Sequence, residues 1–317
     1  MYQEKKICIV IPAYNEEKLI GRVVTTMPDF VDKIVVVDDC STDGTVEVVK
    51  NHISNGNKRL TLLSHDNNRG VGGAIMTGYH YARDNLFDVT VVMAGDAQMD
   101  PDDLPSLIDP VVQGKADYAK GNRLFSGEAW HIIPHARYLG NAALSFMTKI
   151  VSGYWHVTDS QTGYTAASLN VLQTLPLKKV FQRYGMPNDF LVRLNVYDFR
   201  VVDVPIKPIY GIGEKSGIHL GKAVPRLSWL LAGLFLWRMK EKYILRDFHP
   251  LIFFYMLGFL SSSAGFIMGC YLLYYRIFNG AVTPTSALFA AFLFLTGMQS
   301  IFFAMWMDMQ HGRSNNH

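Results

Sequence analysis

The first hundred residues alternate between apolar runs and amphipathic stretches. Each apolar run begins a segment that ends in polar and turn-forming residues: KICIVIPAYNEE, KIVVVDDCSTDGT, RLTLLSHDNNRG and VTVVMAGDAQMDP. The stretches between them have helical patterns, up to about Met27, over residues 45–54 and in GVGGAIMTGYHYARDN. Strands that alternate with helices indicate an α/β fold, in which helices cover both faces of a mostly parallel sheet. Residues 116–220 have a less regular pattern.

Polar clusters follow the four predicted strands. They are PAYNEE, DDCSTDG, HDNNRG and GDAQMD. In open parallel sheets the ligand binds beyond the carboxyl ends of the strands, so these four clusters are expected to share one site.

Two long stretches near the end of the chain are apolar. Residues 251–275 and 277–307 contain no Asp, Glu, Lys or Arg. A helix of about 20 apolar residues crosses a bilayer, so two transmembrane helices are predicted, at about 251–275 and 283–307. Two buried core helices are the alternative, but uncharged runs of this length are rare in soluble cores.

The segment before these spans has a shorter apolar run. Residues 225–245 hold about a dozen apolar residues between basic flanks, with Trp229 and Trp237 included. The pattern favours a helix in the membrane interface, and the alternative is a domain helix packed on the sheet. The predicted organisation is a domain over 1–222, an interfacial helix over 223–247, a two-helix hairpin over 248–310 and a tail over 311–317.

The distribution of charge predicts how the chain is oriented in the membrane. The net charge of the 317 residues is only +3, so a nucleic-acid partner is not suggested. Between Lys207 and Asp247, however, eight Lys/Arg face three acids. The positive-inside rule places residues 1–250 and the C-terminal tail in the cytoplasm, and no signal peptide is expected. The three cysteines lack metal-type spacing and are predicted to be reduced and mostly buried.

Acidic residues at the strand ends supply candidate chemistry. Asp38 and Asp39 are placed to accept hydrogen bonds from a nucleotide base and ribose, with Ser41 or Asp43 capping the next helix. Asp96 and the amide oxygen of Gln98 can hold a divalent cation such as Mg²⁺ beside a diphosphate. Asp100 precedes a proline and two acids, which favours a helix-capping role.

Together these motifs resemble family 2 glycosyltransferases of the GT-A fold. The strings are IVIPAYNEE, VVVDDCSTDGT, NNRGVGGAIMTG, VVMAGDAQMDP, KGNR and DSQTGY, in that order over about residues 5–220. They are similar above all to the branch that uses polyprenyl phosphate, many of whose members end in membrane helices. Each motif alone is weak, whereas their combination is specific.

The resemblance implies a role for each matching residue. Asp96, Arg123 and Arg137 would be catalytic, Asp96 and Gln98 would bind Mg²⁺ or Mn²⁺, and Arg123, Arg137 and Asn141 would bind the acceptor phosphate. The nucleotide sugar would contact Pro12, Ala13, Tyr14, Glu16, Asp38, Asp39, Asn68, Arg69, Gly70, Asp96, Ala97, Gln98, Arg123, Asp159, Gln161, Asp189, Lys215 and Ser216. Within this set, Asp159, Gln161 and Asp189 would shape the sugar pocket, and Lys215 and Ser216 would close over the donor phosphates. Self-association through the membrane helices is also expected.

The chain departs from the family pattern at one position. The usual D-x-D has Ala94 in place of its first Asp, so Asp96 and Gln98 would hold the metal without that partner. A lipid phosphate is already anionic and can attack the anomeric carbon directly, whereas a hydroxyl acceptor needs a general base. The predicted activity is inverting transfer from a nucleotide sugar, a UDP-sugar in preference to GDP-mannose, to polyprenyl phosphate.

Two other hypotheses remain open at this point. One is a membrane glycosyltransferase that builds a polysaccharide or glycolipid on a hydroxyl acceptor. That class commonly has a Q-x-x-R-W motif, which is absent here. The other is a degenerate transferase domain that serves as a membrane scaffold; the joint presence of Asp39, Asp96 and both arginines argues against it.

Overall fold

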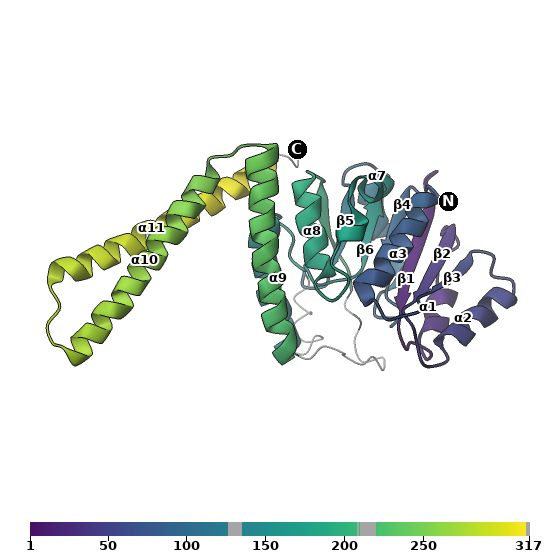
Figure 1. Ribbon diagram of the computed structural model, residues 1–317. Coiled ribbons are helices and arrows are strands. Elements are labelled where there is room, and N and C mark those ends of the chain that lie inside the picture. Colours follow the sequence, from purple (N-terminus) through teal and green to yellow (C-terminus); the bar gives the residue numbers. More distant parts are fainter. Residues whose placement is uncertain (126–134, 208, 210–219, 315–317) are drawn as a thin grey trace. The chain divides into compact units, whose positions relative to one another are not determined.

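Figure 1 shows the computed structural model of the chain, which describes residues 1–125, 135–207, 209 and 220–314. The chain forms two compact units, Met1–Phe235 and Leu236–His317. The strands of the first unit are β1 (Ile7–Ala13), β2 (Lys33–Asp38), β3 (Leu60–Ser64), β4 (Val89–Val92), β5 (Tyr118–Asn122), β6 (Thr165–Ser168) and β7 (Val201–Pro205).

The helices of the first unit connect these strands. They are α1 (Ile20–Thr25), α2 (Thr45–Ser54), α3 (Val71–Asp84), η1 (Pro101–Asp103), α4 (Leu104–Val112), α6 (His135–Ser152), α7 (Leu169–Thr174), η2 (Leu177–Lys179) and α8 (Met186–Val196), followed by α9 (Leu220–Lys240), which runs on into the second unit.

The seven strands form one sheet in the order β3-β2-β1-β4-β6-β5-β7. β1 to β4 are parallel, β6 is antiparallel to both of its neighbours, and β7 is parallel to β5. The predicted α/β fold with a mostly parallel sheet is therefore confirmed. The three strands β5, β6 and β7 fall in the region whose pattern was less regular.

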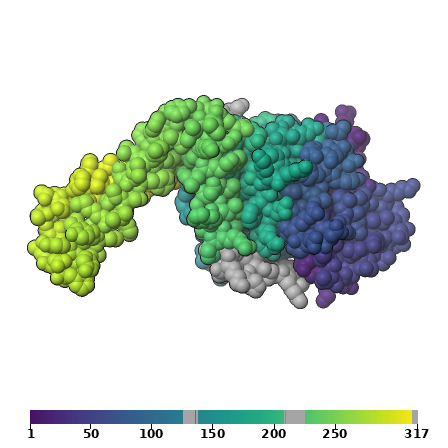
Figure 2. Space-filling view, in the orientation of Figure 1, coloured from purple at the N-terminus to yellow at the C-terminus, as the bar shows by residue number. Residues whose placement is uncertain are grey.

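The alternation of side chains along a strand explains why both faces are covered. In β1, Ile7, Ile9 and Ile11 belong to one buried cluster, and Cys8 and Val10 belong to the other. The first cluster includes residues of α1, α2 and α4, and the second includes residues of α3, α7 and α8. Strands that are buried on both faces are continuously apolar, as β1 and β2 are. Figure 2 shows one face of the molecule in a space-filling view, coloured along the chain as in Figure 1.

Helix α3 approaches the sheet closely at Gly78. A Cβ at this position would lie 2.1 Å from Val10 Cγ1, in the middle of β1. Glycine is therefore needed here for close packing, since α3 could not reach β1 with a larger residue.

Helix α9 has two different sides within the first unit. Leu231 and Leu234 are buried, and a Cβ added at Gly185 would lie 2.2 Å from Leu230 Cδ2, so one side packs on the start of α8. Trp229 on the other side is 84% exposed. The helix thus packs on the domain and also exposes apolar surface.

The second unit contains the end of α9, the π-helical segment η3 (Glu241–Arg246), α10 (Leu251–Phe278) and α11 (Pro284–Ser314). Leu251–Phe278 and Pro284–Gly312 are long and apolar enough to cross a membrane, with mean hydropathies of 1.8 and 1.9. Of the three free cysteines, only Cys8 is buried, so the expectation of mostly buried thiols was wrong: Cys270 is exposed on α10.

Small residues bring α10 and α11 together. A Cβ added at Gly265 would lie 2.4 Å from Phe294 N, and one added at Gly297 would lie 2.3 Å from Ser262 N. Near one end of the pair, the fully buried Arg238 bonds Asp308, with Nη2 to Oδ2 at 2.8 Å, and Tyr243 donates to the same carboxylate. The ion pair joins α9 to α11 within this unit.

Candidate active site

The loops after β1, β2 and β4 have strained backbones. Asn15, Cys40 and Ala97, one in each loop, have φ values of 58°, 65° and 56°. Non-glycine residues seldom adopt positive φ, and where they do, the surrounding structure holds them and a functional site is often nearby.

Hydrogen bonds between the first two loops provide that support. Asn15 Oδ1 accepts from Thr42 N at 2.8 Å, and Asn15 N donates to Ser41 Oγ at 3.0 Å. The N-cap residue of α2 is Gly44, so the prediction that Ser41 or Asp43 is the cap was wrong, although Asp43 Oδ1 accepts from Thr45 N, the first residue of the helix. The ends of β1 and β2 therefore form one fixed surface.

Asp39 anchors the next loop from inside the protein. Its oxygens accept from Arg69 N at 2.8 Å and Gly70 N at 2.7 Å. His65 Nδ1 lies 2.8 Å from Asp39 Oδ1, and His65 Nε2 lies 2.8 Å from Thr77 Oγ1. The carboxylate is buried, so its visible role is to order the Asn68–Gly70 turn that was predicted to lie near the nucleoside. Direct contact of Asp38 or Asp39 with a nucleoside stays a prediction.

The loop after β4 brings Asp96 near Glu16, which lies in the loop after β1. Burial, together with the charges of Asp96 and Asp43, raises the pKa of Glu16 from 4.5 to about 7. The Glu16 side chain packs against Gly95, the residue before Asp96, where an added Cβ would lie 3.4 Å from Glu16 Cγ. A cation would relieve this accumulation of negative charge.

The donor set at this loop suits a hard divalent ion. Asp96 Oδ1 accepts from Gln98 N at 3.1 Å, and Gln98 Nε2 has no hydrogen-bond partner among the described residues. No cluster of three or more His, Cys, Asp or Glu side chains that could hold a metal is found in the described part of the chain. Mg²⁺ is commonly held by one or two carboxylates together with substrate phosphates, so Asp96 and Gln98 fit that ion without further protein ligands.

The residues next to this loop have structural roles. Ala94 N donates to Met99 Sδ at 3.1 Å. Asp100 accepts from Asp102 N, with Pro101 as the first residue of η1, so the predicted capping role of Asp100 is confirmed.

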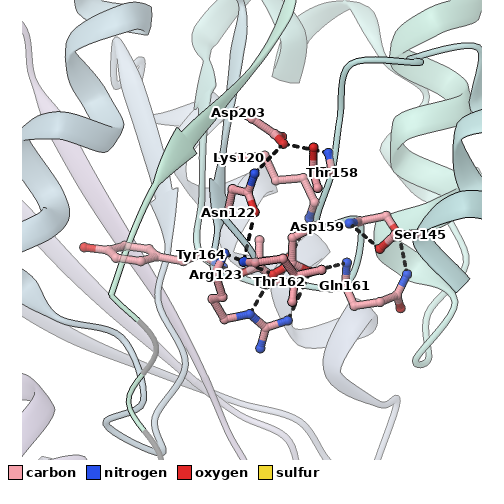
Figure 3. A network of polar contacts seen from close by, with 12 residues as sticks. Lys120, Asn122, Arg123, Ser145, Thr158, Asp159, Gln161, Thr162, Tyr164 and Asp203 are labelled. Carbon is pink, nitrogen blue, oxygen red and sulfur yellow. Dashed lines mark hydrogen bonds and ion pairs between the residues drawn. The ribbon is translucent and has the colours of Figure 1, made fainter. Parts of the chain in front are cut away.

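A polar network lies beyond the carboxyl end of β5 and in the loop before β6 (Figure 3). Arg123 binds the fully buried Asp159 twice, Nε to Oδ2 at 2.8 Å and Nη2 to Oδ1 at 3.2 Å. Gln161 N donates to Asp159 Oδ1 at 3.1 Å. Burial alone would raise the pKa of Asp159, but the charge and hydrogen bonds of Arg123 hold it below its usual value. The network thus joins residues predicted for the acceptor phosphate and for the sugar.

A buried lysine supports the same network. Lys120 Nζ donates to Thr162 O at 2.6 Å. Burial lowers the pKa of Lys120 from 10.5 to about 8, although Asp159 and Asp203 act in the opposite direction. Asp203 Oδ2 in turn accepts from Thr158 N and from Asn122 Nδ2, as Figure 3 shows.

Asp189 was predicted to shape the sugar pocket, but its contacts are with other groups of the protein. Asp189 Oδ2 accepts from Phe181 N at 2.7 Å, and its Oδ1 pairs with Arg193 at 2.9 Å. Its neighbour Asn188 is the residue that contacts the predicted sugar loop, since Asn188 Oδ1 accepts from Gln161 Nε2 at 2.9 Å. A sugar contact by Asp189 stays a prediction.

The remaining predicted residues are placed as follows. Pro12 and Ala13 end β1, Tyr14 is exposed, and Asn141 is half-buried on α6. Arg137 belongs to α6, but its side chain is outside the described part of the structure, as are Lys215 and Ser216 entirely. Five residues of the site were not predicted individually: His65, Thr77, Lys120, Asn188 and Asp203. His65 is the first residue of the predicted HDNNRG cluster, so its position carried a signal that could have found it.

Comparison with known proteins decides what this arrangement belongs to. Residues 8–175 match the family model described as Glycosyl transferase family 2. The chain belongs to glycosyltransferase family 2. It is therefore an enzyme, a glycosyltransferase of the GT-A fold, and the matched region includes Asp39, Asp96, Arg123 and Asp159.

Named relatives are similar over most of their length. The UDP-N-acetylglucosamine–dolichyl-phosphate N-acetylglucosaminyltransferase of Methanococcus voltae is 34% identical over 219 residues, which are 65% of this chain and 87% of the relative. The undecaprenyl-phosphate mannosyltransferase of Micrococcus luteus is 30% identical over 236 residues, 72% of this chain and 95% of the relative.

A solved structure with the same fold is glucosyl-3-phosphoglycerate synthase from Mycobacterium tuberculosis. It was crystallised with Mn²⁺, UDP and glucosyl-3-phosphoglycerate. The TM-score is 0.53 at 21% identity, over 74% of this chain and 80% of that chain. At this identity the likeness concerns the fold.

Proposed function

We propose that this glycosyltransferase moves a sugar from a nucleotide sugar to a membrane polyprenyl phosphate, undecaprenyl or dolichyl, with inversion at the anomeric carbon. The relatives named above act on dolichyl phosphate and undecaprenyl phosphate, which supports this acceptor. The product would be a polyprenyl-phosphate-linked monosaccharide for glycan assembly.

One observation carries the choice of a phosphate acceptor. In the described part of the chain, three carboxylates around the predicted sugar loop bind internal donors: Asp159 binds Arg123, Asp189 binds Phe181 N and Arg193, and Asp203 binds Thr158 N and Asn122 through Oδ2. A hydroxyl acceptor needs a general base within hydrogen-bond reach, and each of these three groups already binds at least one internal donor. A phosphate acceptor needs no such base, because it is ionised at neutral pH.

The proposed reaction forms one bond and breaks one. An oxygen of the acceptor phosphate attacks the anomeric carbon, and the bond from that carbon to the donor diphosphate breaks. The electron pair leaves with the nucleoside diphosphate. Arg123, held in a fixed orientation by Asp159, and Arg137 with Asn141 would bind the acceptor phosphate and offset the repulsion between two anions.

A divalent cation, Mg²⁺ or Mn²⁺, would be held by Asp96 and Gln98 and would neutralise charge on the diphosphate leaving group. The carboxylates of Glu16 and Asp96 make this end of the sheet unfavourable for a diphosphate unless a cation is bound. A UDP-sugar is favoured as donor, since a relative at 34% identity is named for UDP-N-acetylglucosamine, and GDP-mannose is the alternative.

The two long apolar helices suit an enzyme whose acceptor is a membrane lipid. With basic residues concentrated before the first span, the catalytic unit would lie on the cytoplasmic side of the cell membrane. Trp229 and the apolar side of α9 would lie in the interface. Self-association through the hairpin stays a prediction.

The experiment compares two acceptors that differ only in the phosphate. Purified full-length protein in lipid nanodiscs, with Mg²⁺ and labelled UDP-glucose, UDP-N-acetylglucosamine or GDP-mannose, is given either undecaprenyl phosphate or undecaprenol. We expect a mild-acid-labile lipid product from the phosphate only. Transfer to undecaprenol, or donor hydrolysis with no lipid product, would instead favour the glycosyltransferase with a hydroxyl acceptor.

A further inference from the structure

Helix α6 carries a line of polar residues. Asn141, Ser145 and Thr148 are spaced by four and three residues, so they lie on one face of the helix, and position 137 falls on the same face. Ser145 and Thr148 are almost completely buried, at 2% and 1% exposure. A buried face of this kind would ordinarily be apolar.

Both buried hydroxyls bind the elements that form the predicted sugar pocket. Ser145 Oγ accepts from Ser160 N at 3.0 Å and lies 3.2 Å from Ser160 Oγ. Thr148 Oγ1 lies 2.9 Å from Asn188 Oδ1 and 2.8 Å from Leu144 O, and its one proton is shared between these two acceptors. Figure 3 shows Ser145 beside the loop that carries Asp159 and Gln161.

The two contacts belong to one continuous network. Asn188 Oδ1 receives Gln161 Nε2 as well as Thr148, and Gln161 Nε2 also donates to Ser160 Oγ. The loop is tied in turn to Arg123 through Asp159. Helix α6 is therefore fixed at two points about one turn apart: Ser145 contacts Ser160 of the sugar loop, and Thr148 contacts Asn188 of α8, which itself binds Gln161 of that loop.

Hydrogen bonds between buried polar groups restrict the position of a helix more than apolar packing does. Apolar contacts tolerate small rotations and shifts of a helix, whereas a buried hydroxyl that loses its partner is left unsatisfied. Two such contacts on one face set both the rotation and the axial position of α6. Asn141, one turn before Ser145, is thereby directed to the same side as the sugar loop.

We propose that Ser145 and Thr148 are positioning residues for the acceptor: they hold the α6 face that bears Arg137 and Asn141 against the loop that holds the donor sugar. The inference rests on the proposed function, since it assigns the phosphate of the lipid to that face. It concerns the alignment of the two substrates, and no contact of Ser145 or Thr148 with either substrate is required.

The test separates the acceptor from the donor. In Thr148→Val, which keeps the shape and removes the hydroxyl, the KM for undecaprenyl phosphate rises roughly ten-fold, the equivalent of one buried hydrogen bond. The Kd for the nucleotide sugar, measured by calorimetry with Mg²⁺ and no acceptor, stays within about two-fold because Asn188 Oδ1 still accepts from Gln161 Nε2 and the sugar loop keeps that contact. Ser145→Ala acts in the same direction.

Two further variants show whether the hydroxyl is the cause. Thr148→Ser restores it, and the acceptor KM returns to within about three-fold of the unmodified value. Thr174→Val is the matched control, because Thr174 Oγ1 lies 3.3 Å from Asn170 Oδ1 on the exposed surface of α7. Its KM values are unchanged.

The outcomes that would overturn the inference are distinct. An unchanged acceptor KM in Thr148→Val, an equal rise in donor Kd, or a lower Tm with no rescue by Thr148→Ser shows a purely structural role. If the unmodified protein transfers no sugar to any polyprenyl phosphate, the proposed function fails, and the positioning role fails with it. If the unmodified protein transfers the sugar but Thr148→Val changes the acceptor KM and the donor Kd equally, only the positioning role is contradicted.

Discussion

Arg123 and Asp159 form an ion pair with two contacts, Nε to Oδ2 at 2.8 Å and Nη2 to Oδ1 at 3.2 Å. The Asp159 side chain is fully buried, and the Arg123 side chain is 18% exposed. A bidentate pair fixes the orientation of the arginine, which a lysine could not reproduce. The pair therefore connects the end of β5 to the loop before β6 and fixes the orientation of Arg123, whose contact with the acceptor phosphate stays a prediction.

Replacing Asp159 by Asn is expected to destabilise the protein strongly. The change keeps the shape but leaves Arg123 without its counter-charge, so the free energy of unfolding falls by about 3 kcal/mol. Thermal melts of the detergent-solubilised protein measure this as a lower Tm. Asp117→Asn is the matched control, because Asp117 makes the same kind of bidentate pair with Arg200 at a more exposed site. Equal shifts in the two variants would contradict the account.

Lys120 gives a prediction for alkaline pH. Its pKa is lowered by burial to about 8 in the folded protein, whereas the unfolded chain has the ordinary value of 10.5. Between these values the unfolded chain binds a proton that the folded protein has released, so stability rises with pH across this window. In Lys120→Met this contribution disappears. The measurement is Tm from pH 7 to 10.5 for both proteins, and parallel curves would show that Lys120 does not titrate there.

His65 is expected to control donor affinity. His65→Ala removes one of the three partners of Asp39 and loosens the Arg69–Gly70 turn, so the Kd for the nucleotide sugar rises about ten-fold while the acceptor KM is kept. Asp39→Asn weakens the same contact between Asp39 and His65 and is also expected to raise the donor Kd. His80→Ala, on the same helix as Thr77, leaves the donor Kd unchanged. An acceptor effect larger than the donor effect would refute this role.

Asp96 is expected to determine the metal dependence. Asp96→Asn lowers kcat by about a hundred-fold or more, since a group that stabilises transition-state charge is weakened. Gln98→Ala mainly raises the Mg²⁺ concentration needed for half-maximal rate. Initial rates over a Mg²⁺ titration measure both effects. Full activity of the unmodified protein in excess EDTA would show that neither residue acts through a metal.

The helical hairpin should be sensitive at one glycine and tolerant at another. Gly297→Val places side-chain atoms against Ser262 N, 2.3 Å from the Cβ position, and costs about 1–3 kcal/mol by overpacking. Gly269 in α10 has nothing within 4 Å of its Cβ position, so Gly269→Val has the same intrinsic cost and no clash. Thermal melts should show a lower Tm for Gly297→Val only. Similar melts for the two variants would contradict the close approach of α10 and α11.

The sequence predicts those parts of the fold whose signal is local. The strands β1 to β4 are apolar runs of four to seven residues, and α10 and α11 are long and uncharged. β5 and β6 were missed because their sequences, YAKGN and TAAS, are polar or small. They are buried by their neighbours in the sheet, which no local pattern reveals.

The candidate site shows the same division. The Asp100 cap follows from its next three residues, so it could be predicted. The contact between Asp39 and His65 joins residues 26 apart, and that between Thr148 and Asn188 joins residues 40 apart. Such pairs depend on the register of strands and the rotation of helices. Sequence therefore indicated which residues are polar at the strand ends, but not which of them hold the others.

The most direct test of the central claim is the transfer of label from nucleotide sugars to undecaprenyl phosphate by the purified full-length protein. We expect a lipid-linked product with one donor, formed with Mg²⁺ or Mn²⁺, lost in EDTA and lost in Asp96→Ala. A metal-independent product, or donor turnover with no transfer to any polyprenyl phosphate, would contradict it.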